Sequence, residues 1–199
     1  VFILLLGCDK PIKTFSYSSY ALGTNLNVLY NSYDPIANFD KLSDSIFDAL
    51  NKSMSTYIQE SDISKINNGD SLVKVDKNFI MVFKKSKSIW KSTNGYFDPT
   101  IGILTNAYGL GPNTVPNFSI NVDSILAFTG FEKVNINKGL VDIKKGMFLD
   151  FNAIAKGYAV DLISELLIKN GIQSYLIDIG GEMFASGINT VSNSKWRVG

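Results

Sequence analysis

The chain has 199 residues, of which 45% are hydrophobic and 19% charged, and its formal net charge is +1. This composition is typical of a globular domain that builds a core without a structural metal or disulfide, and it excludes disordered and fibrous proteins. The 19 basic residues are balanced by 18 acidic ones. A nucleic-acid-binding protein is therefore not expected, because contact with phosphates needs clustered Lys and Arg.

The chain contains no histidine. Catalytic triads that use His, His-ligated zinc and the usual proton shuttle at neutral pH are thereby excluded. We expect any chemistry to use carboxylates, hydroxyls, Lys, backbone groups or a hard metal ion.

Residues 1–6 form an apolar run that is followed by Gly7 and by the single cysteine, Cys8. The run is too short to span a bilayer, which takes about 20 apolar residues. Its sequence resembles the lipobox of bacterial lipoproteins, in which the signal peptide is cut before a Cys that is then acylated. We expect residues 1–13 to be the remnant of a lipoprotein signal peptide and a tether, with the lipid on Cys8; the alternative is a buried first strand.

The first half of the chain predicts strands followed by helices. Residues 14–30 have strand composition and are broken by a Gly-centred turn or bulge at 22–25, which predicts two strands. Apolar residues at spacings of three and four predict an amphipathic helix over 36–54. A Ser-capped turn of helix follows at 61–67, and a longer helix runs from 79 to about 93.

The middle of the chain contains shorter elements. Asp98 is followed by Pro, which predicts Asp98 as the N-cap of a short helix over 100–108. Residues 111–120 are expected to form a loop, and Asp123 is expected to cap a brief helix over 124–128.

The last part predicts a hairpin over 133–143, a strand over 147–151, a helix over 152–170, strands over 174–179 and 182–186, and the start of a strand at 195–199. No repeat or linker divides these elements. We therefore predict an α+β fold, a single domain with a largely antiparallel sheet and packed helices. The final alternating residues indicate that the domain continues beyond Gly199.

The junction between strand 147–151 and helix 152–170 is a candidate site. Asp150 ends the strand, and small residues open the helix, whose N-terminus carries about half a positive charge. Free amides there suit a phosphate, Lys156 adds a positive charge, and Asp150 can hold a cation such as Mg²⁺. The alternative is that Asp150 is a simple cap and that Lys156 lies on a solvated face.

A second candidate is the segment that carries Tyr96, Phe97 and Asp98. Two aromatic side chains beside a polar acceptor suit a planar heterocycle, although a capping Asp with Phe97 in the core explains the same residues. The Gly180-Gly181 pair permits close approach of a ligand, and a hairpin turn explains it equally well.

Taken in order, these segments resemble the motifs of the ApbE family, the FAD:protein FMN transferases. The matching motifs are Leu22-Gly23-Thr24, Met54-Ser55-Thr56-Tyr57, Ser61-Asp62-Ile63-Ser64-Lys65-Ile66-Asn67, Gly95-Tyr96-Phe97-Asp98-Pro99-Thr100, Ala155-Lys156-Gly157-Tyr158-Ala159-Val160-Asp161 and Gly180-Gly181-Glu182. Leu22 stands where the family usually has Met. The resemblance implies that residues 14–199 are the N-terminal portion of an ApbE-like domain.

The resemblance implies a Mg²⁺-dependent enzyme on the outer, periplasmic side of the bacterial cytoplasmic membrane. Such an enzyme splits the pyrophosphate of FAD, transfers FMN to a Thr or Ser hydroxyl of a partner flavoprotein, and releases AMP. The acceptors of the family include subunits of membrane redox pumps. The positions that match FAD contacts are Leu22, Tyr57, Tyr96, Phe97, Asp98, Asp150 and Lys156. Of these, Asp150 and Lys156 are expected to be catalytic.

The metal site that the resemblance implies is incomplete in this chain. Ala153 matches a position that ligates Mg²⁺ through its backbone oxygen, and the remaining ligands, an Asp and a Thr, are expected beyond Gly199. We therefore expect weak Mg²⁺ binding and low activity from these residues alone. Two other functions stay open: hydrolysis of FAD to FMN and AMP, and a non-catalytic flavin-binding lipoprotein.

Overall fold

The computed structural model describes residues 10–111 and 121–199, so Cys8 and nearly all of the predicted loop 111–120 lie outside the described residues. The chain forms two compact units, one comprising residues up to 46 together with those from 159 onward, and the other residues 47–158. Helices α1 (Phe39–Met54) and α6 (Asn152–Lys169) each contribute residues to both units. Helices and antiparallel sheets occur together, which confirms the predicted α+β class.

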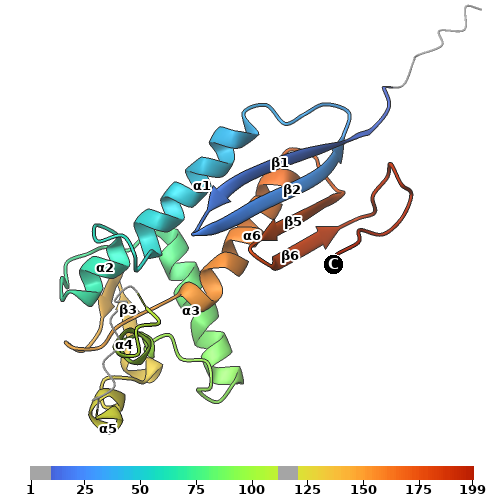
Figure 1. Ribbon diagram of the computed structural model, residues 1–199. Coiled ribbons are helices and arrows are strands. Elements are labelled where there is room, and N and C mark those ends of the chain that lie inside the picture. The colour runs from blue at the N-terminus through green and yellow to red at the C-terminus, as the bar shows by residue number, and fades with distance from the viewer. Residues whose placement is uncertain (1–9, 112–120) are drawn as a thin grey trace, which may run out of the picture. The chain divides into compact units, whose positions relative to one another are not determined.

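The first unit contains a four-stranded antiparallel sheet with the strand order β1-β2-β5-β6 (Figure 1). The strands are β1 (Lys13–Ala21), β2 (Thr24–Ser32), β5 (Tyr175–Ile179) and β6 (Glu182–Ser186). The two strands predicted on either side of 22–25 pair as a hairpin, and the predicted turn at Gly180-Gly181 joins β5 to β6. Leu22 and Gly23 join β1 to β2 with φ angles of 50° and 75°. A two-residue turn with both φ angles positive matches the twist of the flanking strands, which explains the Gly at its second position.

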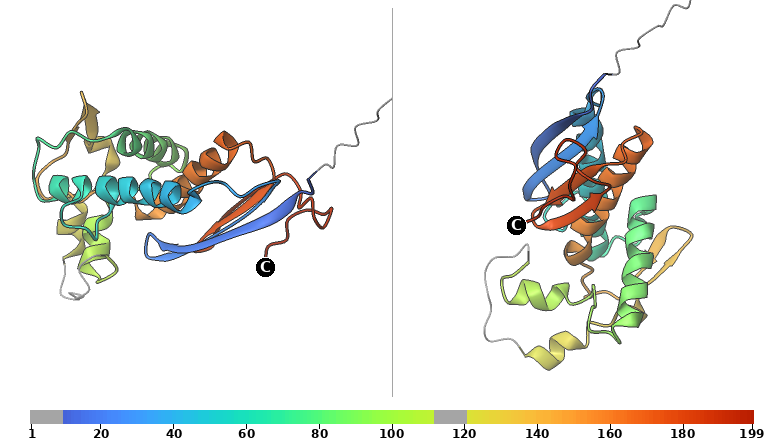
Figure 2. Two further views of the ribbon diagram at one scale, coloured as in Figure 1. Left: turned by 90° about the horizontal axis from the view of Figure 1, so that it is seen from above. Right: turned by 90° about the vertical axis from the view of Figure 1, so that its right-hand side faces the viewer.

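One face of this sheet is covered by helix. Leu26, Val28 and Tyr30 of β2 are buried on that face, and each lies opposite a buried residue of β5. The ring of Phe39, at the start of α1, lies 5.8 Å from the ring of Tyr30. From α6, the Ser164 hydroxyl is 2.6 Å from that of Tyr175 in β5. Figure 2 shows these parts of α1 and α6 on the same side of the sheet.

The second unit is mostly helical. Besides the adjoining parts of α1 and α6, it contains α2 (Asp62–Asn67), α3 (Lys77–Ser92), α4 (Gly102–Ala107), α5 (Val122–Leu126), a 3₁₀ helix (Phe131–Lys133) and the hairpin of β3 (Asn135–Asn137) and β4 (Leu140–Asp142). Its core contains two edge-on aromatic pairs: Phe79 with Phe151 at 5.2 Å and Phe83 with Phe131 at 4.9 Å. Such pairs stabilise by about 1 kcal/mol beyond the burial of their area. They anchor the segments that follow Phe131 and that flank Phe151.

Two of the predicted helix caps are wrong. Helix α4 begins at Gly102, and its N-cap is Ile101, which makes no capping hydrogen bond with its side chain. Asp98 instead accepts the amide of Thr100, two residues on, and so closes a tight turn before the helix. Helix α5 is capped by Asn121, whose side chain accepts the amide of Ser124, and not by Asp123.

The predicted strand over 147–151 is also wrong. This segment forms no strand, and Phe148 makes an isolated parallel bridge with Ile101. The backbone of Leu149 is paired with the side chain of Asn67, which donates to the carbonyl at 2.9 Å and accepts from the amide at 2.8 Å. A side-chain amide therefore stands where a neighbouring strand would be. Residues 195–199 likewise form no strand, and Trp196 Nε1 donates to the carbonyl of Ser186.

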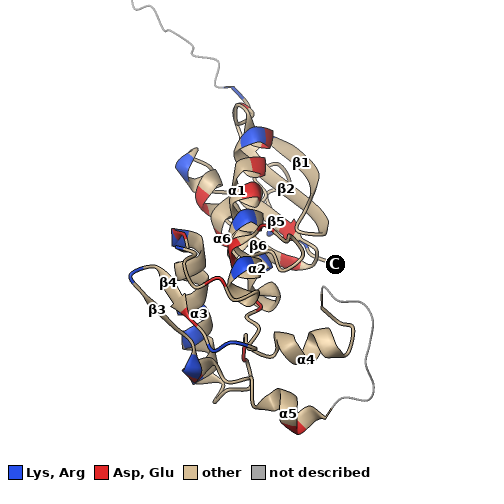
Figure 3. Cartoon of the chain, turned by 90° about the vertical axis from the view of Figure 1, so that its left-hand side faces the viewer, with Lys and Arg blue, Asp and Glu red and all other residues tan. Residues whose placement is uncertain are grey.

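Charges of both signs occur along α1, which carries Asp40, Asp44 and Asp48 together with Lys41 and Lys52 (Figure 3). Helix α4 carries no charged residue, and α5 carries only Asp123. Among the described residues, no helix combines the length and the apolar character needed to cross a membrane.

Candidate functional site

The site predicted from the sequence lies in the second unit, apart from Leu22, which belongs to the β1–β2 turn of the first unit. It is built from the loop of residues 96–101 and from the segment that leads into α6. The backbone amide of Asp150 donates to the carbonyl of Pro99 at 2.8 Å. The structure therefore brings Asp98 and Asp150, which are far apart in the sequence, into neighbouring segments.

Both oxygens of the Asp98 carboxylate accept hydrogen bonds from within the chain. Its Oδ1 accepts from the amide of Thr100 at 2.8 Å and from the Thr100 hydroxyl at 2.6 Å, and its Oδ2 accepts from the amide of Phe131 at 3.1 Å. The Thr100 hydroxyl also accepts from the amide of Gly130 at 2.7 Å. Asp98 and Thr100 therefore fix the loop to the turn at residues 130–131. A contact between Asp98 and FAD remains a prediction.

Lys87 holds the same turn from α3. Its Nζ donates to the carbonyl of Phe131 at 2.7 Å and lies 4.9 Å from the centre of the Phe131 ring. Burial lowers the pKa of Lys87. The ammonium group faces a carbonyl and aromatic rings, so its role in the second unit is to hold the turn in place.

The two aromatic side chains of the loop differ in exposure. Tyr96 is 96% exposed, although it is an aromatic residue, and Phe97 beside it is half-buried. An exposed ring on a loop fixed by part-buried hydrogen bonds offers a stacking surface for a planar group. FAD as the occupant of this surface stays a prediction.

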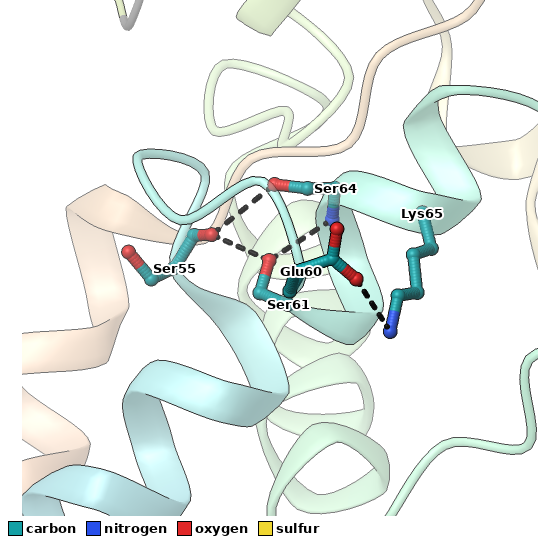
Figure 4. Close-up of polar contacts among 5 residues, drawn as sticks. All are labelled: Ser55, Glu60, Ser61, Ser64 and Lys65. Carbon is teal, nitrogen blue, oxygen red and sulfur yellow. Dashed lines mark hydrogen bonds and ion pairs between the residues drawn. The ribbon is translucent and has the colours of Figure 1, made fainter.

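Tyr57, which is 66% exposed, lies in the connection between α1 and α2. Figure 4 shows how this connection is closed: the carbonyl of Ser55 accepts from the Ser61 hydroxyl at 2.6 Å and from the Ser64 hydroxyl at 3.3 Å. Ser61 also caps α2 by accepting the amide of Ser64 at 3.2 Å. These bonds confirm the predicted cap and hold both ends of the short loop that carries Tyr57.

Asp150 lies half-buried just before α6. Its Oδ1 accepts from the backbone amide of Asn152 at 2.6 Å, and its Oδ2 accepts from Asn152 Nδ2 at 3.2 Å. Burial raises the pKa of Asp150 above its ordinary value of 3.8, and the two hydrogen bonds from Asn152 lower it by less. Asp150 is therefore a better proton acceptor than an exposed Asp.

The start of α6 differs from the anion site expected from the sequence. The amide of Asn152 donates to Asp150, and the amides of Ile154 and Ala155 donate to the carbonyl of Phe151 at 2.9 and 2.8 Å. The expectation that these amides are free for a phosphate is wrong. Lys156, half-buried near the start of α6, remains the cationic group at this end of the helix.

The described residues do not form a magnesium site on their own. Within residues 10–111 and 121–199, no three Asp, Glu or Cys side chains come together as a metal site requires. Asp150 already accepts from Asn152 on both oxygens, and Ala153 is exposed in the first turn of α6. One carboxylate and one carbonyl supply too few oxygen ligands for Mg²⁺, which prefers six.

Gly102 allows close contact between the two segments of the site. A Cβ atom there would lie 2.5 Å from Phe148 Cδ1 and 3.0 Å from the Cβ of Asp150. We expect Gly102→Ala to lower the free energy of unfolding by about 1–3 kcal/mol, because the overlap must be relieved by a shift of one segment. Urea unfolding measures this.

Gly157 of α6 provides the matched control for Gly102. Among the described residues, nothing lies within 4 Å of a Cβ atom built there. Gly157→Ala is expected to raise stability by about 0.5–1 kcal/mol, because Ala favours helix. Equal effects of the two substitutions would show that the close approach at Gly102 does not matter.

Sequence reasoning missed three residues of the site. Thr100 and Asn67 belong to motifs that resemble the ApbE family, but nothing in their local sequence identifies their partners. Asn152 stands at a helix start, where Asn is common as a cap, and so it gave no distinct signal.

The fold and the site define a member of the ApbE family. The model of that family matches residues 22–199, and the chain belongs to it. This confirms the family predicted from the motifs, and the match extends over both compact units.

The relatives of the chain are flavin transferases by name. The FAD:protein FMN transferase of Vibrio cholerae is 32% identical over 207 residues, which cover 98% of this chain and 61% of that protein. The protein of the same name from Haemophilus influenzae is 29% identical, with coverages of 98% and 60%. The chain thus spans about three fifths of the length of these curated relatives.

Solved structures agree with the fold. The flavin transferase ApbE from Vibrio cholerae has a TM-score of 0.86 with 28% identity, covering 94% of this chain and 63% of that one. The apo form of the flavinyl transferase ApbE from Pseudomonas stutzeri has a TM-score of 0.85 with 29% identity, covering 94% and 64%.

Proposed function

We propose that the protein containing this chain is an FAD:protein FMN transferase. It transfers FMN from FAD to a Thr or Ser hydroxyl of a partner flavoprotein: a phosphorus–oxygen bond of the pyrophosphate breaks, a phosphoester to the hydroxyl forms, and AMP leaves. The names of the relatives support this activity. The observation that carries it here is the bond between Asp150 and Pro99, which places a carboxylate beside the exposed aromatic loop.

The residues of this chain have distinct roles in the proposal. Tyr57, Tyr96 and Phe97 supply ring surfaces for FAD, and Leu22 is a further contact. Lys156 neutralises charge on the pyrophosphate, since phosphoryl transfer depends mainly on positioning and on electrostatic stabilisation. Asp150, with its raised pKa, accepts the proton of the attacking hydroxyl.

The test is the intact mass of an acceptor domain after incubation with the complete protein, FAD and Mg²⁺. A subunit of a membrane redox pump is the acceptor that we propose. A mass gain of one FMN is expected, and the same reaction with FMN in place of FAD is the control, because FMN has no pyrophosphate to cleave. Release of free FMN and AMP without a mass gain would show a hydrolase. Binding of FAD without turnover would show a flavin-binding protein.

Magnesium dependence belongs to the same proposal. Mg²⁺ would screen the pyrophosphate charge when bound, with the carbonyl of Ala153 as one ligand and the others outside the described residues. We expect EDTA to abolish FMN transfer by the complete protein and excess Mg²⁺ to restore it. Transfer that continues unchanged in EDTA would contradict a metal requirement.

We also propose that the protein is anchored by a lipid on Cys8 to the outer side of the cytoplasmic membrane. Cys8→Ser removes the thiol that would be acylated. We expect the variant to leave the membrane fraction and to appear in the soluble fraction, as measured by cell fractionation and immunoblotting. Unchanged membrane association of Cys8→Ser would contradict the anchor.

A further inference from the structure

Asn152 contacts both oxygens of Asp150. The backbone amide reaches Oδ1 at 2.6 Å, and the side-chain Nδ2 reaches Oδ2 at 3.2 Å. A carboxylate that accepts on both oxygens from a single residue is restricted in rotation. Removal of the side-chain donor would leave Asp150 held on one oxygen only.

Asn152 is itself oriented by a second partner. Its Nδ2 also donates to the hydroxyl oxygen of Thr56 at 3.1 Å, and Thr56 is buried. A side-chain amide has two N–H donors, and both are used here, one toward each acceptor. Turning the amide over would place its oxygen against the carboxylate, so the two acceptors define one orientation. Neither Asp, which lacks a donor, nor Leu can replace it.

Thr56 lies directly before Tyr57, in the loop that the Ser55 and Ser61 bonds hold closed (Figure 4). Hydrogen bonds therefore connect the loop that carries Tyr57, through Asn152, to Asp150. Thr56 and Asn152 are 96 residues apart in the sequence. The connection joins one exposed aromatic position to the carboxylate at which we place the chemistry.

We propose that Thr56 and Asn152 act as a pair of positioning residues that orient the Asp150 carboxylate relative to the loop of Tyr57, and that FAD affinity and FMN transfer depend on this pair. The inference rests on the proposed function. Thr56 and Asn152 need not touch FAD, because they act through Asp150. A structural role alone would affect only the stability of the protein.

The test uses a double-mutant cycle in the complete protein. Thr56→Val removes the acceptor at nearly constant volume, Asn152→Ala removes the donor, and Thr56→Ser retains the hydroxyl. We expect each of the first two to weaken FAD binding and to lower kcat for transfer by about 10-fold, and the double variant to lose little more, because residues of one network are not additive. Thr56→Ser is expected to stay within about 2-fold of wild type.

Two substitutions elsewhere serve as matched controls. Thr129, which is half-buried, and Asn170, which is exposed, also use their side chains in hydrogen bonds, to the carbonyls of Leu126 and Leu166. Thr129→Val and Asn170→Ala should leave the Kd for FAD and kcat unchanged. The Kd is measured by quenching of flavin fluorescence, and circular dichroism shows that each variant is folded.

The outcomes separate the two proposals. Folded pair variants with wild-type Kd and kcat, or strictly additive losses, overturn the positioning role while leaving the transferase intact. Wild-type protein that binds FAD but transfers no FMN overturns the proposed function. In that case the double-mutant cycle, measured by the Kd for FAD, decides whether Thr56 and Asn152 orient the site. Wild-type protein that binds no FAD overturns both.

Discussion

Asp150→Asn in the complete protein is expected to lower FMN transfer at least about 100-fold while leaving the fold intact. The substitution preserves shape and removes the charge and the proton acceptor. The amide of Asn152 can turn over to meet the new side chain, with the Thr56 hydroxyl then acting as donor. The intact-mass assay of the acceptor measures the loss, and wild-type rates in the variant would remove Asp150 from the mechanism.

The same substitution is expected to change the pH dependence of stability. The pKa of Asp150 is raised in the folded protein, mainly by burial, so the folded state holds the proton more tightly than the unfolded state. The stability due to this proton is fully present below the ordinary value of 3.8 and is lost as the pH rises through the folded-state pKa. The Asp150→Asn variant has no such proton to lose. Its free energy of unfolding should therefore rise relative to that of wild type as the pH rises.

Urea unfolding of both proteins between about pH 3.5 and 8 checks this sign. We expect the difference in unfolding free energy between the variant and wild type to increase with pH, and then to level off. A difference that does not change with pH, or one that favours wild type at neutral pH, would show that the Asp150 carboxylate is not penalised by burial.

Thr100→Val is expected to give the largest loss of stability among the polar substitutions in the site. Thr100 is fully buried, and its hydroxyl joins Asp98 to the amide of Gly130. Valine keeps the shape but leaves the part-buried N–H of Gly130 without its acceptor and an Asp98 oxygen with one donor fewer. We expect a loss of about 2–4 kcal/mol in unfolding free energy. FAD binding should weaken as well, because the loop of Tyr96 is then less fixed.

Thr100→Ser is the control, since it keeps the hydroxyl and removes one methyl group, which costs about 1 kcal/mol. Urea unfolding compares the two variants. If Thr100→Val is as stable as Thr100→Ser, the Thr100 hydroxyl does not stabilise the loop, and other contacts hold Asp98 in place.

Most elements of the fold follow from local sequence. The spacing of apolar residues predicts α1, α3 and α6 closely, because a helix of that length needs only one apolar face and its own hydrogen bonds. The glycines near 139 and 180 likewise predict hairpins, and the Gly-centred turn or bulge near 23 separates two predicted strands; all three pairs of strands occur. The failures lie where the partner is distant: residues 147–151 are paired with Asn67 and Pro99. Local periodicity contains no information about such partners.

The candidate site follows from the sequence only in part. The resemblance to the ApbE family identifies Asp98, Asp150 and Tyr96, but the use of the Asp98 carboxylate within the chain is seen only in the structure. The same holds for Thr56 and Asn152, which meet across 96 residues. A capping Asp and a helix-opening Asn have ordinary local explanations, so their three-dimensional partners decide their roles.

The order of strands in the first unit has a consequence for synthesis of the protein on the ribosome. Strands β1 and β2 are made early, but β5, which pairs with β2, begins only at Tyr175. At about 5–20 residues per second, the chain between Ser32 and Tyr175 takes roughly 7–30 s to translate. During that time the apolar face of Leu26, Val28 and Tyr30 lacks its β5 neighbour. The nascent hairpin is thus a natural target for chaperones that bind exposed apolar strands.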